Sequence, residues 1–216
     1  MEGEGKSLKK IVVFDNSFGG ELFADYIEKE LPIFDVIRVI CWGEKLSRDF
    51  TIQKMRPYIG HADLIILLNP FLTITALGYI RKKFPNQNFI GLKPVSKIPK
   101  NRSKRVLFLT TKQTRQTITY QLHHFSLAKK TRIIDCDKWV KLIDAGEYIT
   151  EEMVNDLKAL GDFKPQLVVL DNAALLDAKP EIRKYFGPTV AIRDGFRDTF
   201  NELCTILNIR GGTKKK

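Results

Sequence analysis

Polar side chains follow four apolar runs of the chain, each at the point where the run ends. The four sets are Asp15, Asn16 and Ser17; Asn69 and Pro70; Thr110 and Thr111; and Asp171 and Asn172. Carboxylate, amide and hydroxyl groups can orient a small polar ligand, and the helix N-termini expected behind them favour anions. Brought together by the fold, the four sets would suit a small carboxylate or a phosphate.

Each set also has a simpler interpretation as a helix cap. Asn, Asp, Ser and Thr are the preferred N-cap residues, so one of them after a strand says little about function. Taken alone, Asp15 and Asp171 are more typical of caps than of catalysts. Four polar sets at corresponding strand ends are more specific. The pair Gly19-Gly20 fits tight strand-helix packing, and "DNSFGG" lacks the GxGxxG pattern of a dinucleotide site.

The histidines predict no metal site. His123 and His124 are neighbours in an expected helix, so their side chains point about 100° apart and form no two-histidine face. His61 precedes a strand and therefore lies at the wrong end of it. The sequence also has no Ser-His-Asp spacing. We expect no metal and no cofactor.

An α/β fold would position the four polar sets. Eight short apolar runs read as strands buried on both faces, because Val, Ile and Leu are nearly continuous in them: Ile11–Phe14, Val36–Cys41, Leu64–Leu68, Asn88–Gly91, Arg105–Thr110, Ile133–Cys136, Leu167–Leu170 and Val190–Ile192. Helical patterns lie between them, including Glu21–Leu31, Phe71–Phe84, Thr114–Lys129, Glu151–Leu160, Ala178–Phe186 and Thr199–Leu207. This alternation predicts parallel sheets, whose ligands bind at the carboxyl ends of the strands.

A weak internal repeat predicts two similar lobes. "LIILLNPFLTITALGYIRKKF" can be laid against "LVVLDNAALLDAKPEIRKYF", and "IVVFDNSFGG" parallels "VLFLTTKQT". Chance similarity is the alternative, since all strand-helix units look alike. We expect two pseudo-symmetric lobes, each a mostly parallel sheet flanked by helices, with a cleft between them. Lobe one would comprise residues 1–95 and 188–216, and lobe two residues 96–187.

Composition predicts a cytoplasmic protein. The 216 residues are 44% hydrophobic, which is enough for one large domain or two small lobes with real cores. No apolar run approaches the ~20 residues of a membrane helix, and "MEGEGKSLKK" has no signal-peptide core. The three cysteines, Cys41, Cys136 and Cys204, are scattered, which argues against a disulfide framework and fits a reducing compartment.

The net charge of +11 leaves two interpretations open. Part of the excess lies in "KPVSKIPKNRSKR", Lys93 to Arg105, and in the C-terminal "GGTKKK". Both segments read as an exposed linker or tail, and a solvated basic surface explains them. The alternative is a partner that is an anionic macromolecule, bound through Lys93–Arg105 and the C-terminal lysine tail.

The order of motifs resembles glutamate racemase and the wider aspartate/glutamate racemase superfamily. The resemblance covers nearly the whole chain and rests on "VVFDNSFGG", "CWGEKLSRDF", "LIILLNPFLTITAL", "GLKPV", "VLFLTTKQTRQTITYQ", "IDCDKWVKLIDAGE", "LVVLDNAALL" and "VAIRDGFRDTFNEL". Each motif alone is weak, but the series in this order is fairly specific. The resemblance implies a two-lobe fold with the ligand between the lobes.

The family's reaction is a cofactor-free racemisation with two cysteine thiols, one on each side of the α-carbon. The positions that match these cysteines hold Leu68 and Asp171, and Ala173 stands at the position of a family histidine. Leucine has no proton to exchange, so the resemblance implies a protein that has lost this chemistry. The resemblance leaves open whether the protein is an enzyme, with the balance of the argument against it.

The residues that match the family's binding positions, exactly or by substitution, form the predicted ligand site. They are Asp15, Asn16, Gly43, Asn69, Thr110, Thr111 and Asn172. The resemblance implies a small dicarboxylate or an amino acid as the ligand, and a homodimer as the assembly. Two alternatives stay open. One is altered chemistry that uses the carboxylates of Asp15 and Asp171, and the other is a basic module that binds nucleic acid or protein.

Overall fold

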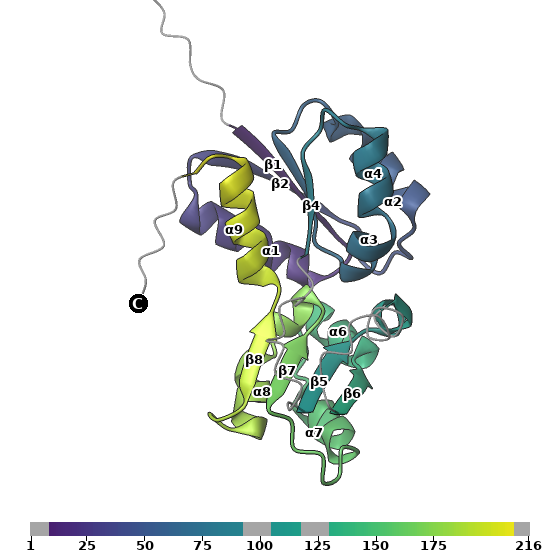
Figure 1. The fold of residues 1–216 in the computed structure, drawn as a ribbon, viewed down its shortest axis with the longest axis vertical. Helices are drawn as coiled ribbons and strands as arrows, with labels where there is room; N and C mark the ends of the chain where they lie inside the picture. Colours follow the sequence, from purple (N-terminus) through teal and green to yellow (C-terminus); the bar gives the residue numbers. More distant parts are fainter. Residues whose placement is uncertain (1–8, 93–104, 118–129, 210–216) are drawn as a thin grey trace, which may run out of the picture.

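Two parallel four-stranded sheets form the framework of the protein (Figure 1). The computed structural model describes residues 9–92, 105–117 and 130–209. Sheet A has the order β2-β1-β3-β4, with β1 at Lys9–Asp15, β2 at Phe34–Ile40, β3 at Leu64–Leu67 and β4 at Phe89–Gly91. Sheet B has the order β6-β5-β7-β8, with β5 at Arg105–Thr110, β6 at Lys130–Asp135, β7 at Leu167–Leu170 and β8 at Ala191–Asp194. The predicted α/β fold with two pseudo-symmetric lobes is confirmed.

The strand pairing makes the two sheets equivalent residue by residue. Phe14 of β1 pairs with Leu67 of β3, and Leu109 of β5 pairs with Leu170 of β7. The next residues, Leu68 and Asp171, therefore occupy the same place in the two sheets. By the same register, Asp15 in sheet A corresponds to Thr110 in sheet B.

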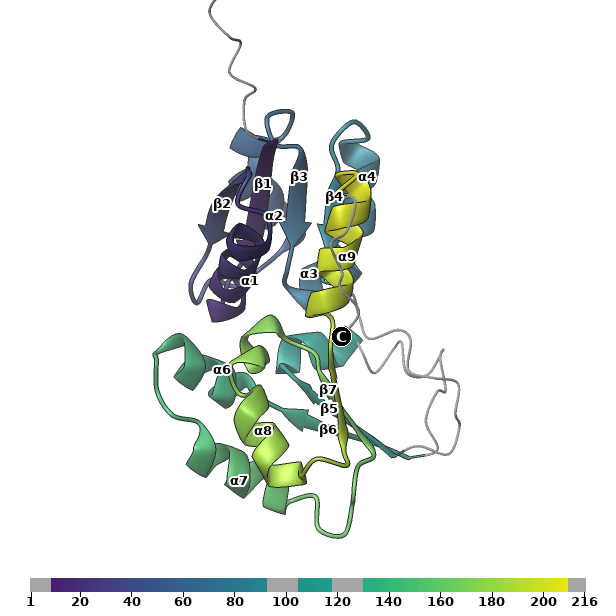
Figure 2. The ribbon, with the colours of Figure 1, turned by 90° about the vertical axis from the view of Figure 1, so that its left-hand side faces the viewer.

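In lobe one, helices cover both faces of sheet A. Alternate residues of β1 point to opposite faces, so Ile11 and Val13 join one apolar cluster while Val12 and Phe14 join another. The first cluster lies under α1 and α9, and the second under α2, α3 and α4 (Figure 2). The helices span Phe18–Glu30 (α1), Arg48–Met55 (α2), Pro70–Thr75 (α3), Leu77–Lys83 (α4) and Phe196–Ile206 (α9), with a 3-10 turn η1 at Arg56–Tyr58.

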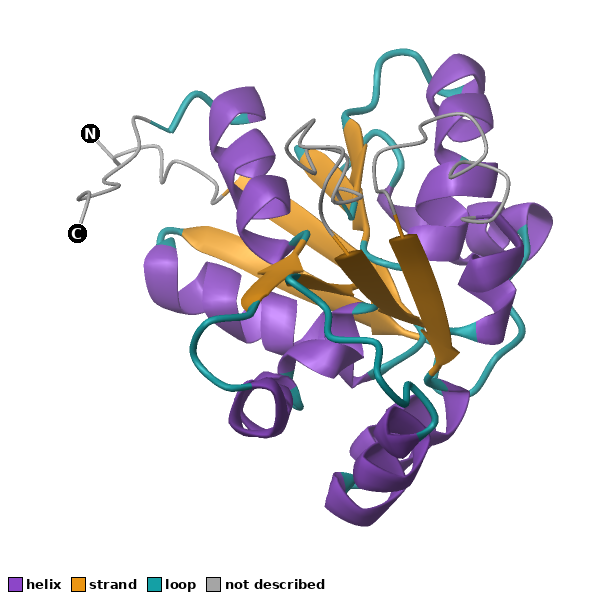
Figure 3. Ribbon diagram, turned by 60° about the horizontal axis from the view of Figure 1, so that its bottom comes forward, coloured by secondary structure: helices purple, strands orange, loops and turns teal. Residues whose placement is uncertain are grey.

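In lobe two, helices flank sheet B (Figure 3). They are α6 (Asp137–Asp144), α7 (Thr150–Lys158), α8 (Lys179–Phe186) and the 3-10 turn η2 (Ala173–Leu176). Trp139 of α6 is fully buried in this core, and its indole N–H donates to Asp156 Oδ2 at 2.7 Å. Residues 112–117 are also helical.

Three details differ from the sequence-based expectation. β8 pairs with β7, so residues 191–194 belong to sheet B, whereas the predicted division assigned all of 188–216 to lobe one. The predicted helix Phe71–Phe84 is interrupted at Ala76, whose φ of −121° is not helical. The helices α2 and α6 were not predicted. Most of the predicted helix Thr114–Lys129, with its two neighbouring histidines, lies outside the described residues.

None of the helices in the described ranges is both long and apolar enough to cross a membrane.

Candidate functional site

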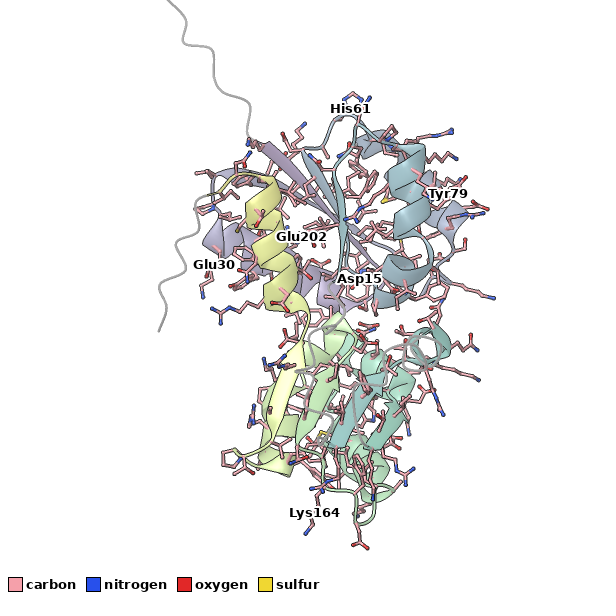
Figure 4. All side chains as sticks on the ribbon, viewed as in Figure 1. Asp15, Glu30, His61, Tyr79, Lys164 and Glu202 are labelled. Carbon is pink, nitrogen blue, oxygen red and sulfur yellow. The ribbon has the colours of Figure 1, made fainter. Side chains whose placement is uncertain are left out.

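Asp15 is the centre of the polar set in lobe one. It ends β1 and is only 1% exposed, at the boundary between the lobes (Figure 4). Its Oδ1 accepts the backbone N–H of Asn16 at 2.8 Å, and its Oδ2 accepts the hydroxyl of Ser17 at 2.9 Å. Burial raises the pKa of Asp15 to about 7, although these hydrogen bonds lower it. Asp15 is therefore a buried carboxyl and not a helix cap.

Two amides connect the ends of β1 and β3. Asn69 Nδ2 donates to Asn16 Oδ1 at 3.0 Å, and Asn16 Nδ2 donates to the carbonyl of Glu44 at 3.1 Å. Asn69 Oδ1 also accepts the N–H of Leu72, which makes Asn69 the N-cap of α3. The neighbouring Gly43 has φ +67° and an open surrounding, so the turn itself requires glycine there.

The set in lobe two is built around Asp171. Its Oδ2 accepts the hydroxyl of Thr110, at the end of β5, at 3.2 Å. Asp171 is 7% exposed, and burial raises its pKa to about 7. The other two predicted residues act as caps: Asn172 Oδ1 accepts the N–H of Ala174 at the start of η2, and Thr111 Oγ1 accepts the N–H of Thr114. In the described part of the chain, neither polar set hydrogen-bonds to the other.

Leu68 has no access to solvent. It belongs to the apolar cluster of lobe one, and that cluster also contains Ala173, which comes from lobe two. Leu68 is therefore part of apolar packing that includes residues of both lobes. The side chain of Leu68 offers no polar or ionisable group at this strand end.

The start of α1 holds the lobes together. The N–H of Phe18 donates to Asp144 Oδ1 of lobe two at 2.7 Å, and the Phe18 ring packs against the lobe-two cluster. A Cβ on Gly19 would lie 2.4 Å from the Cβ of Ala173, and one on Gly20 would lie 2.7 Å from the Cβ of Asp15. The packing interpretation of Gly19-Gly20 is confirmed. Gly20 allows close packing within lobe one, and Gly19 allows close packing between the lobes.

Comparison with solved structures assigns the fold. Escherichia coli glutamate racemase, solved with L-glutamate and the activator UDP-MurNAc-Ala, superposes with a TM-score of 0.78 at 18% identity, covering 96% of this chain and 85% of that one. The chain has the glutamate racemase fold. The glutamate racemase isoform RacE1 of Bacillus anthracis has a TM-score of 0.76 at 18% identity, covering 94% of this chain and 83% of that one. Allantoin racemase of Klebsiella pneumoniae has a TM-score of 0.61 at 13% identity, covering 93% of this chain and 88% of that one. No family model and no curated sequence matches the chain significantly.

Two of the three thiols of this racemase-fold protein lie near the polar sets, but at different strands from Leu68 and Asp171. Cys41 follows β2 and its N–H donates to the carbonyl of Asp15; Cys136 follows β6 and donates in the same way to Thr110. Burial raises the pKa of both thiols, that of Cys136 well above its usual value, so neither is a thiolate at neutral pH. All three cysteines are free, with Cys204 in α9.

Among the described residues no group of three His, Cys, Asp or Glu side chains is placed to hold a metal ion.

The racemase fold thus brings most predicted residues to the lobe junction, but in two separate sets. Asp15, Asn16 and Asn69 form one set, and Thr110 and Asp171 form the other. Sequence reasoning missed Asp144, which contacts the start of α1 and also raises the pKa of Asp15 by its charge. Asp144 and Phe18 are 126 residues apart, and no local pattern links them.

Proposed function

We propose that this protein is a racemase-fold protein that does not racemise amino acids and that acts by binding. The observation that carries the proposal is Leu68, which is fully buried in an apolar cluster shared with Ala173 of the opposite lobe. Two-base racemisation needs an ionisable group on each side of the α-carbon. Leucine can neither remove nor return a proton.

The remaining ionisable groups support the same conclusion. Asp171 offers one carboxyl at the matching place in lobe two, but one carboxyl alone cannot serve both faces of a substrate. Cys41 and Cys136 have raised pKa values and stand at the ends of other strands. A protonated thiol is a poor base.

The hydrogen bonds within the junction argue against a retained amino-acid ligand at this place. The amide of Asn69 donates to Asn16 Oδ1, the amide of Asn16 donates to the carbonyl of Glu44, and both carboxyl oxygens of Asp15 accept hydrogen bonds. A small dicarboxylate would have to replace these internal bonds, and replacing satisfied hydrogen bonds gains little. Residual binding of such a ligand at this junction is therefore expected to be weak.

The test is incorporation of solvent deuterium at the α-carbon. Purified protein is incubated in deuterated buffer with L- and D-glutamate and with L- and D-aspartate, and the α-proton is followed by NMR beside a glutamate racemase as positive control. We expect no exchange above the protein-free rate. Deuterium at the α-carbon, or D-glutamate formed from L-glutamate, would overturn the proposal.

The double variant Leu68→Cys/Asp171→Cys tests whether racemisation is absent only because the two thiols are absent. We expect it to stay inactive, because Asn69 still donates to Asn16 and residue 68 still belongs to the apolar cluster that includes Ala173. The matched control is Leu68→Ala/Asp171→Ala, which makes similar cavities without thiols. Exchange in the cysteine variant alone would show that the rest of the site is intact.

A second candidate function rests on the two buried carboxyls. The pKa values of Asp15 and Asp171 are both raised to about 7, which is the range of an effective general acid or base at neutral pH. An enzyme with carboxylate-based chemistry would lose at least about a hundredfold in rate in Asp171→Asn while its fold is kept. If any activity found for the protein survives both Asp15→Asn and Asp171→Asn, this candidate fails.

A further inference from the structure

Lobe one carries opposite charges on its two helical layers. We call α2, η1 and α4 the basic layer: six cations stand there against one carboxylate, Asp49, for a net charge of +5. On the other face of sheet A, α1 and α9 carry two cations against six carboxylates, for a net charge of −4. The six cations of the basic layer are Arg48, Lys54, Arg56, Arg81, Lys82 and Lys83.

Figure 4 shows that the two helical layers lie on opposite sides of lobe one. Tyr79 of the basic layer is labelled on one side of lobe one, and Glu30 and Glu202 are labelled on the other. All six cations of the basic layer are exposed. The charge is therefore on the surface, where a partner can reach it, and it is concentrated on one face of the lobe.

The cations of the basic layer are mostly not neutralised within the protein. No carboxylate in the described ranges forms an ion pair with Lys54, Lys82 or Lys83. The opposite layer behaves differently, since three carboxylates of α1 enclose Arg38 of β2, the nearest at 2.6 Å. Within lobe one, the basic layer therefore keeps three exposed ammonium groups available for an external anion.

An aromatic ring organises the centre of the basic layer. The guanidinium carbon of Arg48 lies 4.3 Å from the centre of the Tyr79 ring, and Lys83 Nζ lies 5.9 Å from it. The Arg48 contact links α2 to α4, and the Lys83 contact lies within α4. A guanidinium stacked on a ring is held in a defined plane with its N–H groups directed outward at its edge, and that arrangement suits phosphate oxygens.

The composition of the surface distinguishes between classes of anionic partner. Of the large hydrophobic side chains that are exposed in the described residues, only Tyr79 lies on the basic layer, and Arg48 stacks against it. A protein interface has an apolar centre, and a membrane-binding surface inserts apolar side chains. Interfaces with nucleic acid are more polar and far more positive than protein interfaces.

We propose that the basic layer is a docking surface for nucleic acid, held by its phosphate backbone without readout of base sequence. Arg48, Lys54, Lys82 and Lys83 supply the phosphate contacts, and the acidic layer of α1 and α9 repels the same polyanion from the opposite face. The surface is independent of the lobe junction. A racemase assay and a nucleic-acid assay can therefore fail separately.

The test compares two triple variants of the full chain by fluorescence anisotropy with a labelled single-stranded oligonucleotide and its duplex. Lys54→Gln/Lys82→Gln/Lys83→Gln removes three charges from the basic layer, and Lys141→Gln/Lys158→Gln/Lys184→Gln removes three exposed charges from lobe two. Losing three phosphate contacts should reduce the slope of log affinity against log salt by about 2 for the single strand. We expect at least a tenfold loss of affinity, on the order set by that slope, in the basic-layer variant only.

Four results would overturn the proposal. They are no binding of wild-type protein at low salt, unchanged binding by the basic-layer variant, equal losses in the two variants, and a selective loss for polyglutamate or for phosphatidylserine vesicles while nucleic-acid binding persists. Circular dichroism and thermal melts of both variants accompany the binding data. Neither variant should lose stability, because all six lysines are exposed.

Discussion

Leu68 and Asp171 stand at the same place in the two sheets and have opposite properties. The N–H of each donates to the preceding central strand, to Phe14 and to Leu109 respectively, at 2.9 Å in both cases. One side chain completes an apolar cluster, and the other is a buried carboxyl with a single hydroxyl donor. The backbone position is fixed by strand pairing, so the two lobes hold side chains of different chemistry there while sharing the same strand arrangement.

The neighbours at the end of each central strand explain which side chain each lobe tolerates. Asp171 has Thr110 beside it, and Thr110 donates a hydrogen bond. The equivalent neighbour of Leu68 is Asp15, another carboxyl. An acidic residue at position 68 would therefore place two carboxyls together in a buried site, where like charges raise the cost of ionisation.

The largest effect is expected from exchanging the two side chains. Leu68→Asp removes a buried leucine and adds a carboxyl beside Asp15, so we expect a loss of about 4 kcal/mol or more in the free energy of unfolding. Asp171→Leu removes a carboxyl that burial disfavours and leaves only the Thr110 hydroxyl without its acceptor, at about 1–2 kcal/mol. Urea denaturation of both variants measures the difference. Equal costs would show that the two strand ends are not distinct environments.

The second effect concerns the dependence of stability on pH. The pKa of Asp171 is about 7 in the folded protein and near 3.8 when unfolded, so its contribution is complete below about pH 4 and is lost as the pH rises through 7. The slope in this window is at most about 1.4 kcal/mol per pH unit. Asp171→Asn removes the titration and keeps the shape. Its melting temperature should therefore rise relative to wild type between pH 4 and 7 and run parallel above about pH 8.

Asp15 stays in both proteins of that experiment and contributes the same trend to each. The difference between the two melting curves therefore isolates Asp171. Curves that run parallel from pH 4 to 8 would mean that the carboxyl of Asp171 ionises as it does in water.

The third effect tests the contact between the lobes. Gly19→Ala would bring a methyl group to 2.4 Å from Ala173, and the resulting overpacking should cost about 1–3 kcal/mol. Gly78→Ala in the exposed part of α4 is the matched control, because nothing lies within 4 Å of its added Cβ. The control should gain about 0.5–1 kcal/mol from helix propensity. Thermal melts that shift in the same direction would rule out a tight junction at Gly19.

The smallest effect is expected at the hydrogen bond between the lobes. Asp144→Ala leaves the N–H of Phe18 without its acceptor and should cost about 1 kcal/mol, as for the loss of a helix N-cap. It also removes a charge that raises the pKa of Asp15, so that pKa should fall. Carbon-13 NMR titration measures the second change, with the exposed Asp162→Ala as control. An Asp15 pKa that stays fixed would place Asp144 too far away to matter.

The sequence predicted the strands and their polar ends because both signals are local. Buried parallel strands read as continuous Val, Ile and Leu, and Asn69, Asn172 and Thr111 cap the helical segments that follow directly after them. The helix α2, "RDFTIQKM", was missed because only a few of its residues are apolar. The place of β8 depends on which sheet it pairs with, and the Phe18–Asp144 bond depends on docking of the lobes. Neither is encoded in a short stretch of residues.

The return of α9 to lobe one has a consequence for synthesis on the ribosome. Phe200, Leu203 and Leu207 complete the apolar cluster between α9 and sheet A, but they follow every strand of lobe two in the chain. Strands β5 to β8 are continuous in sequence order and can close their sheet as soon as they emerge. The lobe that is translated first must therefore finish folding last, with one face of its sheet uncovered until α9 arrives.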